Sequence, residues 1–330
     1  EARYRPGEWS LAGKRVELQT DDGLRIAPSD FRLDWRDDAA SGTVEGRASA
    51  SFLDLGALAQ LAGHMPFDPA TRRLLQTYRP QGRIAELKAS WTVHDETLQR
   101  YALKASFDRL GLRAEAYFPG AAGLSGQIDL NERGGDLLLD SQQATLALPA
   151  VFPVAEIPRD LLKARANWRL RPQGEQQRLE VTLDRLDFSG PDDAGSARGS
   201  YVNDGNGPGV IDLAARVDRA DGKAVWRYMP HAVNADARNW IRRGIVSGRG
   251  YDGRLVLKGN LRDFPFRDPA QGEFSVTAKA ADVRIDYAPG WPLIDHVDAD
   301  MSFGIGMKIN AQRGEILGAR LSGVQVTIPD

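Results

Sequence analysis

Three glycines in the segment 247–260 have a spacing that could do chemistry, because Gly248, Gly250 and Gly253 follow the order G-x-G-x-x-G. In dinucleotide-binding folds such glycines let the backbone approach a pyrophosphate, which lies at the N-terminus of a helix. That chemistry requires a strand before the glycines and a helix after them. The elements on either side therefore decide what these glycines can do.

The elements around the glycines are expected in the reverse order. Asn234 is a good helix N-cap, and Ile241 and Ile245 are four residues apart, so the pattern predicts a helix that leads into the glycines. Residues 254–258 then alternate polar and apolar side chains, which predicts a strand. We interpret the glycines as a joint between a helix and a strand, with Gly248 as a left-handed cap, and not as a nucleotide site.

The other polar residues form no catalytic or metal motif. Asp295, His296 and Asp298 fall on a predicted strand entry, where adjacent residues point to opposite faces, which favours a surface role. Asp192 and Asp193 lack the alternating carboxylates of a calcium loop and indicate a turn. Paired carboxylates of a glycoside hydrolase stay an open alternative, but the pattern favours a protein that is not an enzyme and has no cofactor or metal. None of the four histidines has a metal-motif partner: His64, His94, His231 and His296.

Composition excludes several other classes of protein. The chain has 43 Lys and Arg against 45 Asp and Glu without a basic cluster, which argues against a nucleic-acid partner. It has no cysteine, so disulfides, thiolate zinc sites and cysteine nucleophiles are excluded. It lacks the run of about 18 apolar residues that a transmembrane helix needs. It starts at Glu1 without methionine or signal sequence, so we expect a piece of a longer protein.

The dominant pattern along the chain is the period-two alternation of β-strands. Phe31, Leu33 and Trp35, for example, alternate with charged residues, and similar runs recur between turn residues from one end to the other. About twenty short strands at a spacing of 8–12 residues predict an antiparallel meander. The chain is therefore expected to be mainly β, as one continuous elongated segment over residues 1–330.

Two predicted helices look like copies of each other. Residues 65–88 and 229–254 each contain a short amphipathic helix followed by a glycine, Gly82 in the first copy and Gly248 in the second. In the first copy Asp68 would cap the helix and Pro69 would take its first position. We expect two weak repeat units, about 1–220 and 221–330, each with a helix-to-strand junction.

Two architectures fit this pattern. A β-sandwich would bury each apolar face against a second sheet and would suit a structural or adhesive scaffold. A single long sheet that curls would leave its apolar face as the wall of an open groove, and about twenty strands exceed the usual size of an open sheet that does not curl. Exposing acyl chains to water costs about 0.8 kcal/mol per CH₂, so a continuous apolar wall suits lipid that crosses water. At about 4.8 Å per strand, that wall would be on the order of 100 Å long.

Several motifs together resemble one family. Residues 226–230 (WRYMP), 261–266 (LRDFPF), 287–292 (YAPGWP) and 301–304 (MSFG) are similar, in order and spacing, to the YhdP and AsmA-like proteins of Gram-negative envelopes, relatives of the TamB group. The resemblance implies a periplasmic β structure curled around an apolar groove, with an inner-membrane anchor outside this segment. It implies passive conduction of phospholipid toward the outer membrane and supplies no catalytic residues.

These lines of reasoning lead to one set of predicted lining residues. Their partners would be phospholipid acyl chains, and the inner and outer membranes through parts outside the segment. We expect the two repeat helices to lie over the groove mouth as lids or braces, with packing on the outside of the sheet as the alternative. The predicted lining residues are Phe31, Leu33, Trp35, Val181, Leu183, Ile211, Leu213, Leu255, Leu257, Phe274, Val276, Val283 and Ile285.

Overall fold

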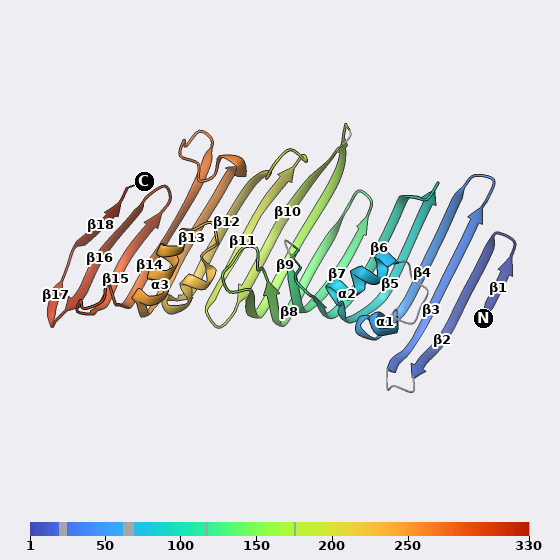
Figure 1. Ribbon diagram of the computed structural model, residues 1–330, viewed down its shortest axis with the longest axis horizontal. Coiled ribbons are helices and arrows are strands. Elements are labelled where there is room, and N and C mark those ends of the chain that lie inside the picture. The colour runs from blue at the N-terminus through green and yellow to red at the C-terminus, as the bar shows by residue number, and fades with distance from the viewer. Residues whose placement is uncertain (20–24, 62–68, 116–117, 175, 330) are drawn as a thin grey trace. The chain divides into compact units, whose positions relative to one another are not determined.

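The chain folds into a mainly β structure, shown by a computed structural model that describes residues 1–19, 25–61, 69–115, 118–174 and 176–329 (Figure 1). Its described residues form 18 strands of one antiparallel sheet, which is not closed into a barrel. Helices are few and short. The fold class expected from the sequence is confirmed.

Strands that are neighbours in the sequence pair with each other up to β17, and β18 pairs with β16, so the sheet is a meander. Most strands are longer than the short runs that the sequence predicted, and β9 reaches 18 residues. The strand bounds are β1 Ala2–Arg5, β2 Glu8–Gln19, β3 Arg25–Asp38, β4 Thr43–Asp54, β5 Gln81–His94, β6 Thr97–Leu112, β7 Gly120–Asn131, β8 Gly134–Ala147, β9 Glu156–Gln173, β10 Gln176–Ser189, β11 Asp193–Asn203, β12 Val210–Asp221, β13 Ile245–Asn260, β14 Gly272–Ile285, β15 Ile294–Phe303, β16 Met307–Ile316, β17 Ala319–Leu321 and β18 Val324–Ile328.

The chain divides into two compact units. The first unit contains Glu1–Ala147 and Arg165–Leu170, and the second contains Leu148–Ala164 and Arg171–Asp330. Each unit has one predicted helix-to-strand junction, the first between α2 and β5 and the second between α3 and β13. Descent of these junctions from a repeat, with a division near residue 220, stays a prediction.

The described parts of the two expected helices lie where their sequence signals predicted them. Helix α2 (Pro69–Tyr78) and helix α3 (Ala235–Gly244) are the two expected helices, and the Asn234 side chain accepts the Asp236 N–H at 2.7 Å as the predicted N-cap. The predicted cap Asp68 and the motif residues around it lie outside the described residues. Helix α1 (Leu55–Leu61) was not predicted, because seven residues are too few to show a helical period. Two 3₁₀ helices, η1 (Gly222–Tyr228) and η2 (Leu261–Asp263), flank β13 on either side.

Bulges interrupt the strand ladders, and several carry a residue in the left-handed region. Such conformations cost roughly 1–3 kcal/mol each outside glycine, so the surrounding pairing must hold them in place. A bulge bends its strand and increases the local twist, and bulged strands are a general way to curve a sheet. The left-handed strand residues are Arg15 (φ 49°), Glu86 (53°), Arg109 (50°) and Gln143 (55°) in the first unit, and Asp252 (51°), Asp282 (53°) and His296 (54°) in the second.

Side chains of the neighbouring strand accept the N–H groups that these bulges leave unpaired. The Arg109 N–H donates to Ser125 Oγ at 3.1 Å, and the Ser125 N–H donates in turn to Ser141 Oγ at 2.9 Å. In the second unit the Asp282 N–H donates to Asp298 Oδ1 at 2.9 Å. These acceptors satisfy the backbone N–H groups that the bulges release from the ladder, and they link each bulge to the next strand.

The glycine joint differs in one respect from the expectation. Helix α3 ends at Gly244 and its C-cap Ile245 is extended (φ −91°), so the prediction that Gly248 forms a left-handed helix cap is wrong. Gly248 lies inside β13 with φ 137°, and a Cβ there would lie 2.7 Å from a methyl carbon of Val283. Gly82 is similar: it lies inside β5 with φ 99°, and a Cβ there would lie 2.4 Å from the Arg109 carbonyl oxygen. Both glycines allow close approach of the next strand, and the helix-before-strand order excludes a phosphate loop.

A matched pair of substitutions tests this role of Gly248. Gly248→Ala forces a side chain into the Val283 contact at an unfavourable φ and should lower the free energy of unfolding by about 1–3 kcal/mol. Gly250→Ala, two residues along the same strand, meets no atom closer than 3.4 Å and should be nearly neutral. Thermal unfolding followed by circular dichroism measures both, and equal losses in the two variants would contradict this explanation.

Candidate functional site: the apolar face of the sheet

In the first unit, cross-strand pairing collects the apolar side chains on one face. Leu11 lies opposite Leu33, Leu33 opposite Ala48, Ala48 opposite Ala89 and Ala89 opposite Leu103. Residues that face each other directly across an antiparallel pair share a face of the sheet. This row of apolar side chains therefore crosses five consecutive strands. The predicted lining residues of this unit, which all lie on this face, are Phe31, Leu33 and Trp35.

The second unit has the same arrangement. Leu183 lies opposite Gly199, Gly199 opposite Leu213, Leu213 opposite Leu257 and Leu257 opposite Phe274. Beyond the bulges the face continues as a cluster around buried Val283 and Val297. Most of these side chains are only half-buried, as expected for one face of a single sheet layer. The predicted lining residues on this face are Val181, Leu183, Ile211, Leu213, Leu255, Leu257, Phe274, Val276, Val283 and Ile285.

Aromatic rings on this face lie across glycines of the paired strand. A Cβ on Gly46 would lie 2.1 Å from the Trp91 ring, so only glycine at this position gives the ring room. A ring that lies over a glycine covers exposed backbone and stays close to the sheet, a stabilising arrangement known for glycines in sheets. The aromatic side chains therefore project only a short way above the apolar face. The other directly opposed pairs are Phe31 with Gly13, Phe107 with Gly126 and Phe188 with Gly195.

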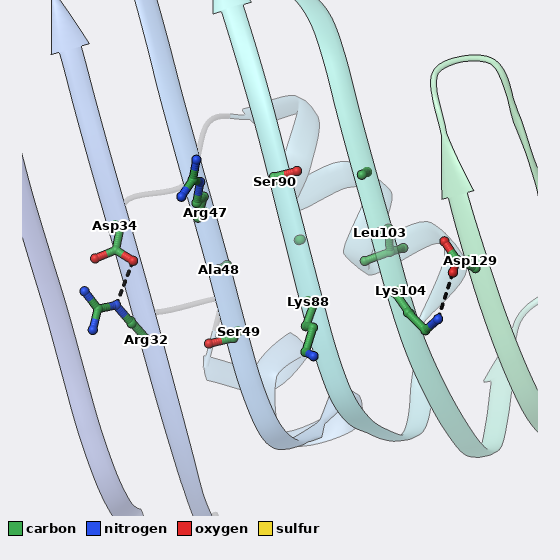
Figure 2. A pocket seen from close by; sticks show the side chains of 12 residues that line it. Arg32, Asp34, Arg47, Ala48, Ser49, Lys88, Ser90, Leu103, Lys104 and Asp129 are labelled. Atoms are coloured by element: carbon green, nitrogen blue, oxygen red, sulfur yellow. Dashed lines mark hydrogen bonds and ion pairs between the residues drawn. The ribbon is translucent and has the colours of Figure 1, made fainter.

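The opposite face of the first unit is charged. Figure 2 shows a shallow pocket of about 370 Å³ on β3 to β7, where Arg32 pairs with Asp34 at 2.8 Å and Lys104 pairs with Asp129 at 3.0 Å. The hydrogen bond from Arg32 lowers the pKa of the Asp34 carboxyl group. Lys88 lies directly opposite Lys104, an arrangement that only a solvated surface tolerates well. The alternation thus separates an apolar face from a polar one.

Asp192 and Asp193, for which the sequence indicated a turn and not a calcium loop, belong to a buried ion cluster. Asp193 pairs with Arg159, whose side chain is 8% exposed. Asp192 accepts hydrogen bonds from Arg227 Nη1 at 2.9 Å and from the Tyr228 hydroxyl at 3.2 Å. The cluster joins β9 and the start of β11 to η1. Each carboxylate has a cationic partner, and removal of one partner would leave the other charge buried without compensation.

The Tyr228 hydroxyl is perturbed by this cluster. Burial raises the pKa of Tyr228 to about 12, with a further contribution from the negative charge of Asp193. Both effects disfavour the phenolate, so Tyr228 stays protonated and continues to donate to Asp192. No sequence pattern predicted this cluster, because its members come from separate elements.

The remaining candidate residues form exposed pairs. His296 Nδ1 lies 2.7 Å from Asp282 Oδ1, and Asp298 contacts Arg313. Over the described ranges, no group of three or more carboxylate or histidine side chains is placed to hold a metal ion. Among the helices of the described chain, none has the length and hydropathy required to cross a bilayer.

Comparison with known proteins assigns the family. A family model described as YhdP protein matches residues 1–330. The chain belongs to the YhdP family. A curated relative, the intermembrane phospholipid transporter YhdP of Escherichia coli (strain K12), is 25% identical over 347 aligned residues, which cover 99% of this chain and 26% of the relative. The chain therefore spans about a quarter of that YhdP protein. No solved structure matches the chain.

Breaking the buried ion pair should destabilise this YhdP-family segment strongly. Asp193→Asn leaves the Arg159 guanidinium buried without its counter-charge, at a cost of about 3–5 kcal/mol in the free energy of unfolding. Asp212→Asn removes one partner of the exposed pair with Lys258 and should change stability little. Urea unfolding of the two variants measures the difference, and a small loss in Asp193→Asn would show that the ion pair is dispensable.

Tyr228 should make stability sensitive to alkaline pH. Its folded pKa lies above its ordinary value of 10, so its contribution to stability is complete below pH 10 and is lost as the pH rises toward 12. Tyr228→Phe has no proton to lose there, so its melting temperature should fall less over this interval. Thermal unfolding across that pH range tests the effect, and parallel curves for the two proteins would contradict it.

Proposed function

We propose that this chain is a periplasmic segment of a bridge-like lipid transfer protein, whose apolar face conducts phospholipid between the inner and outer membranes without enzymatic chemistry. One observation carries the proposal: in each unit the apolar side chains form half-exposed rows that run from strand to strand, while the charged side chains of the first unit lie on the other face. The curated relative from Escherichia coli is an intermembrane phospholipid transporter, which supports the proposal.

The geometry suits movement as well as binding. Strands repeat about every 4.8 Å, so an acyl chain that moves across the strands meets similar apolar contacts at each step. Exposure of the chain to water would cost about 0.8 kcal/mol per CH₂, which makes any interruption of the lining a barrier. Because the aromatic rings of this face lie across glycines, they stay close to the sheet and do not block the movement of an acyl chain across the strands. A continuous and low lining thus favours passive sliding over tight capture at one position.

The bulges and helices supply the walls of the proposed groove. Bulged strands bend, and helix α1 lies against β3, β4 and β5, where Ala50 and Ala57 are buried. In the second unit α3 contacts β13 and η1. Figure 1 shows the helices beside the strand ends in each unit. We propose that the two expected helices, α2 and α3, brace the groove mouth, together with α1, which the sequence did not predict.

Photo-crosslinking from matched neighbouring positions tests the proposal. A photoreactive residue at Leu183, Leu257 or Val276 should capture phospholipid in cells, because these positions lie on the apolar face. Lipid extraction and mass spectrometry of the captured adducts provide the measurement.

The controls are the next residues on the same strands. Thr182, Lys258 and Thr277 point to the opposite face and should capture little or no lipid. Equal capture from both sets would contradict the lipid path. Capture of a protein in place of lipid from the apolar set would favour the alternative, a structural or adhesive scaffold of the envelope whose apolar face is covered by another protein.

A further inference from the structure

Four amphipathic aromatic residues form a row across the first unit, the aromatic row Trp9, Trp35, Trp91 and Tyr101. Trp9 lies opposite Trp35, and Trp91 lies opposite Tyr101; Gly46 lies between Trp35 and Trp91 in the register. The Trp9 and Trp35 rings stack at 6.0 Å and 15°, and the Trp35 and Trp91 rings meet edge to face at 6.2 Å. The row is therefore continuous over the apolar face.

The aromatic row has a defined place along the strands. It lies near the ends that carry the short turns, since β3 ends at Asp38 and β5 at His94. On one side of the row the same face carries Val44 opposite Val93 and Val93 opposite Leu98, followed by exposed polar turn residues such as Asp95 and Glu96. On the other side, toward the ends that carry α1 and α2, the same face continues with the Leu33 row. Along these strands the face thus changes from polar turns, through one aliphatic position, to the aromatic row and then to the Leu33 row.

The chemistry of the row fits the interface of a lipid. Tryptophan and tyrosine combine an apolar ring with one polar hydrogen-bonding group and concentrate where hydrocarbon meets headgroups. Trp9 is 36% exposed. Within the part of the chain that the structure describes, no hydrogen bond uses the indole N–H of Trp9, Trp35 or Trp91, whereas the Trp240 N–H donates to the Tyr287 carbonyl at 3.0 Å. Three indole donors are therefore free in the aromatic row.

The dimensions also agree. From Trp35 to Ser29, the buried residue that ends the run on β3, six residues of strand cover about 20 Å. One leaflet of a bilayer has a hydrocarbon thickness of about 15 Å, half of the 30 Å core. An acyl chain that starts at the aromatic row would therefore end on the same strands, before the helices.

We infer that the aromatic row holds the ester and phosphate region of bound phospholipid, with the indole N–H groups as donors to its oxygens and the acyl chains directed toward the helix ends of the strands. This inference rests on the proposed function, because it orients the lipid that the apolar face would carry. It gives the lipids on these strands of the first unit the same orientation, headgroup at the turn ends and tails inward.

Two photoreactive phosphatidylethanolamines test the orientation in the unsubstituted protein. One has its diazirine near the ester end of an acyl chain, and the other has it near the methyl end. After irradiation, peptide mass spectrometry should place the ester-end label on the peptides of the aromatic row and the methyl-end label near Phe31 and Ala50.

The possible outcomes distinguish the inferred lipid orientation from the proposed function. Reversed labels, or the same labels from both probes, would overturn the orientation and leave the conduit intact. No label on the apolar face from either probe would contradict the proposed function itself.

Substitutions that keep an aromatic ring but remove the indole N–H test the role of these hydrogen-bond donors. The double variant Trp35→Phe with Trp91→Phe retains apolar area but loses two indole N–H groups, so the ester-end label on these peptides should spread to neighbouring strand positions. Trp291→Phe, at an exposed loop position of the second unit, should leave the labelling pattern unchanged. An unaltered pattern in the double variant would show that the N–H groups do not position the lipid.

Discussion

Backbone pairing between consecutive strands is the interaction on which all other features of the two units depend. A β-sandwich adds a second sheet that packs against the apolar side chains, but the described strands here all belong to one sheet. The ladder alone therefore decides which side chains share a face. A slip of one residue in β13 would bring Lys258 into the row that now contains Leu257. The register is thus as important for the apolar face as the apolar residues themselves.

Bulges, side-chain acceptors and ring-over-glycine pairs solve different parts of one problem, which is to bend long strands without losing this register. The bulge at Asp282 bends β14, and Asp298 of the next strand accepts the N–H that the bend releases. Gly248 gives Val283 room beside that bend. Trp91 covers the backbone of Gly46, where a larger residue would push the ring away from the sheet. These contacts link each strand to its neighbour and make the curvature cooperative.

The sequence predicted those features that a local periodicity or a local capping residue indicates. Alternation at Phe31, Leu33 and Trp35 placed their side chains on one face, and Asn234 placed the start of α3. It did not predict the bulges, because residues such as Glu86 are ordinary in type and take their conformation from the register of the next strand. The partner of Asp193 is 34 residues away, at Arg159, so its burial has no local signal. The left-handed cap expected at Gly248 failed for the same reason, since the contact with Val283 sets its conformation.

The meander order has a consequence for how such a chain forms and changes length. Because nearly every strand pairs with its neighbours in the sequence, the sheet has mostly local topology, and it can grow one hairpin at a time. An added hairpin would extend the sheet by about 10 Å without disturbing the strands already formed. Insertion or loss of hairpins would therefore change the number of strands in the sheet, while the pattern within each strand stays the same.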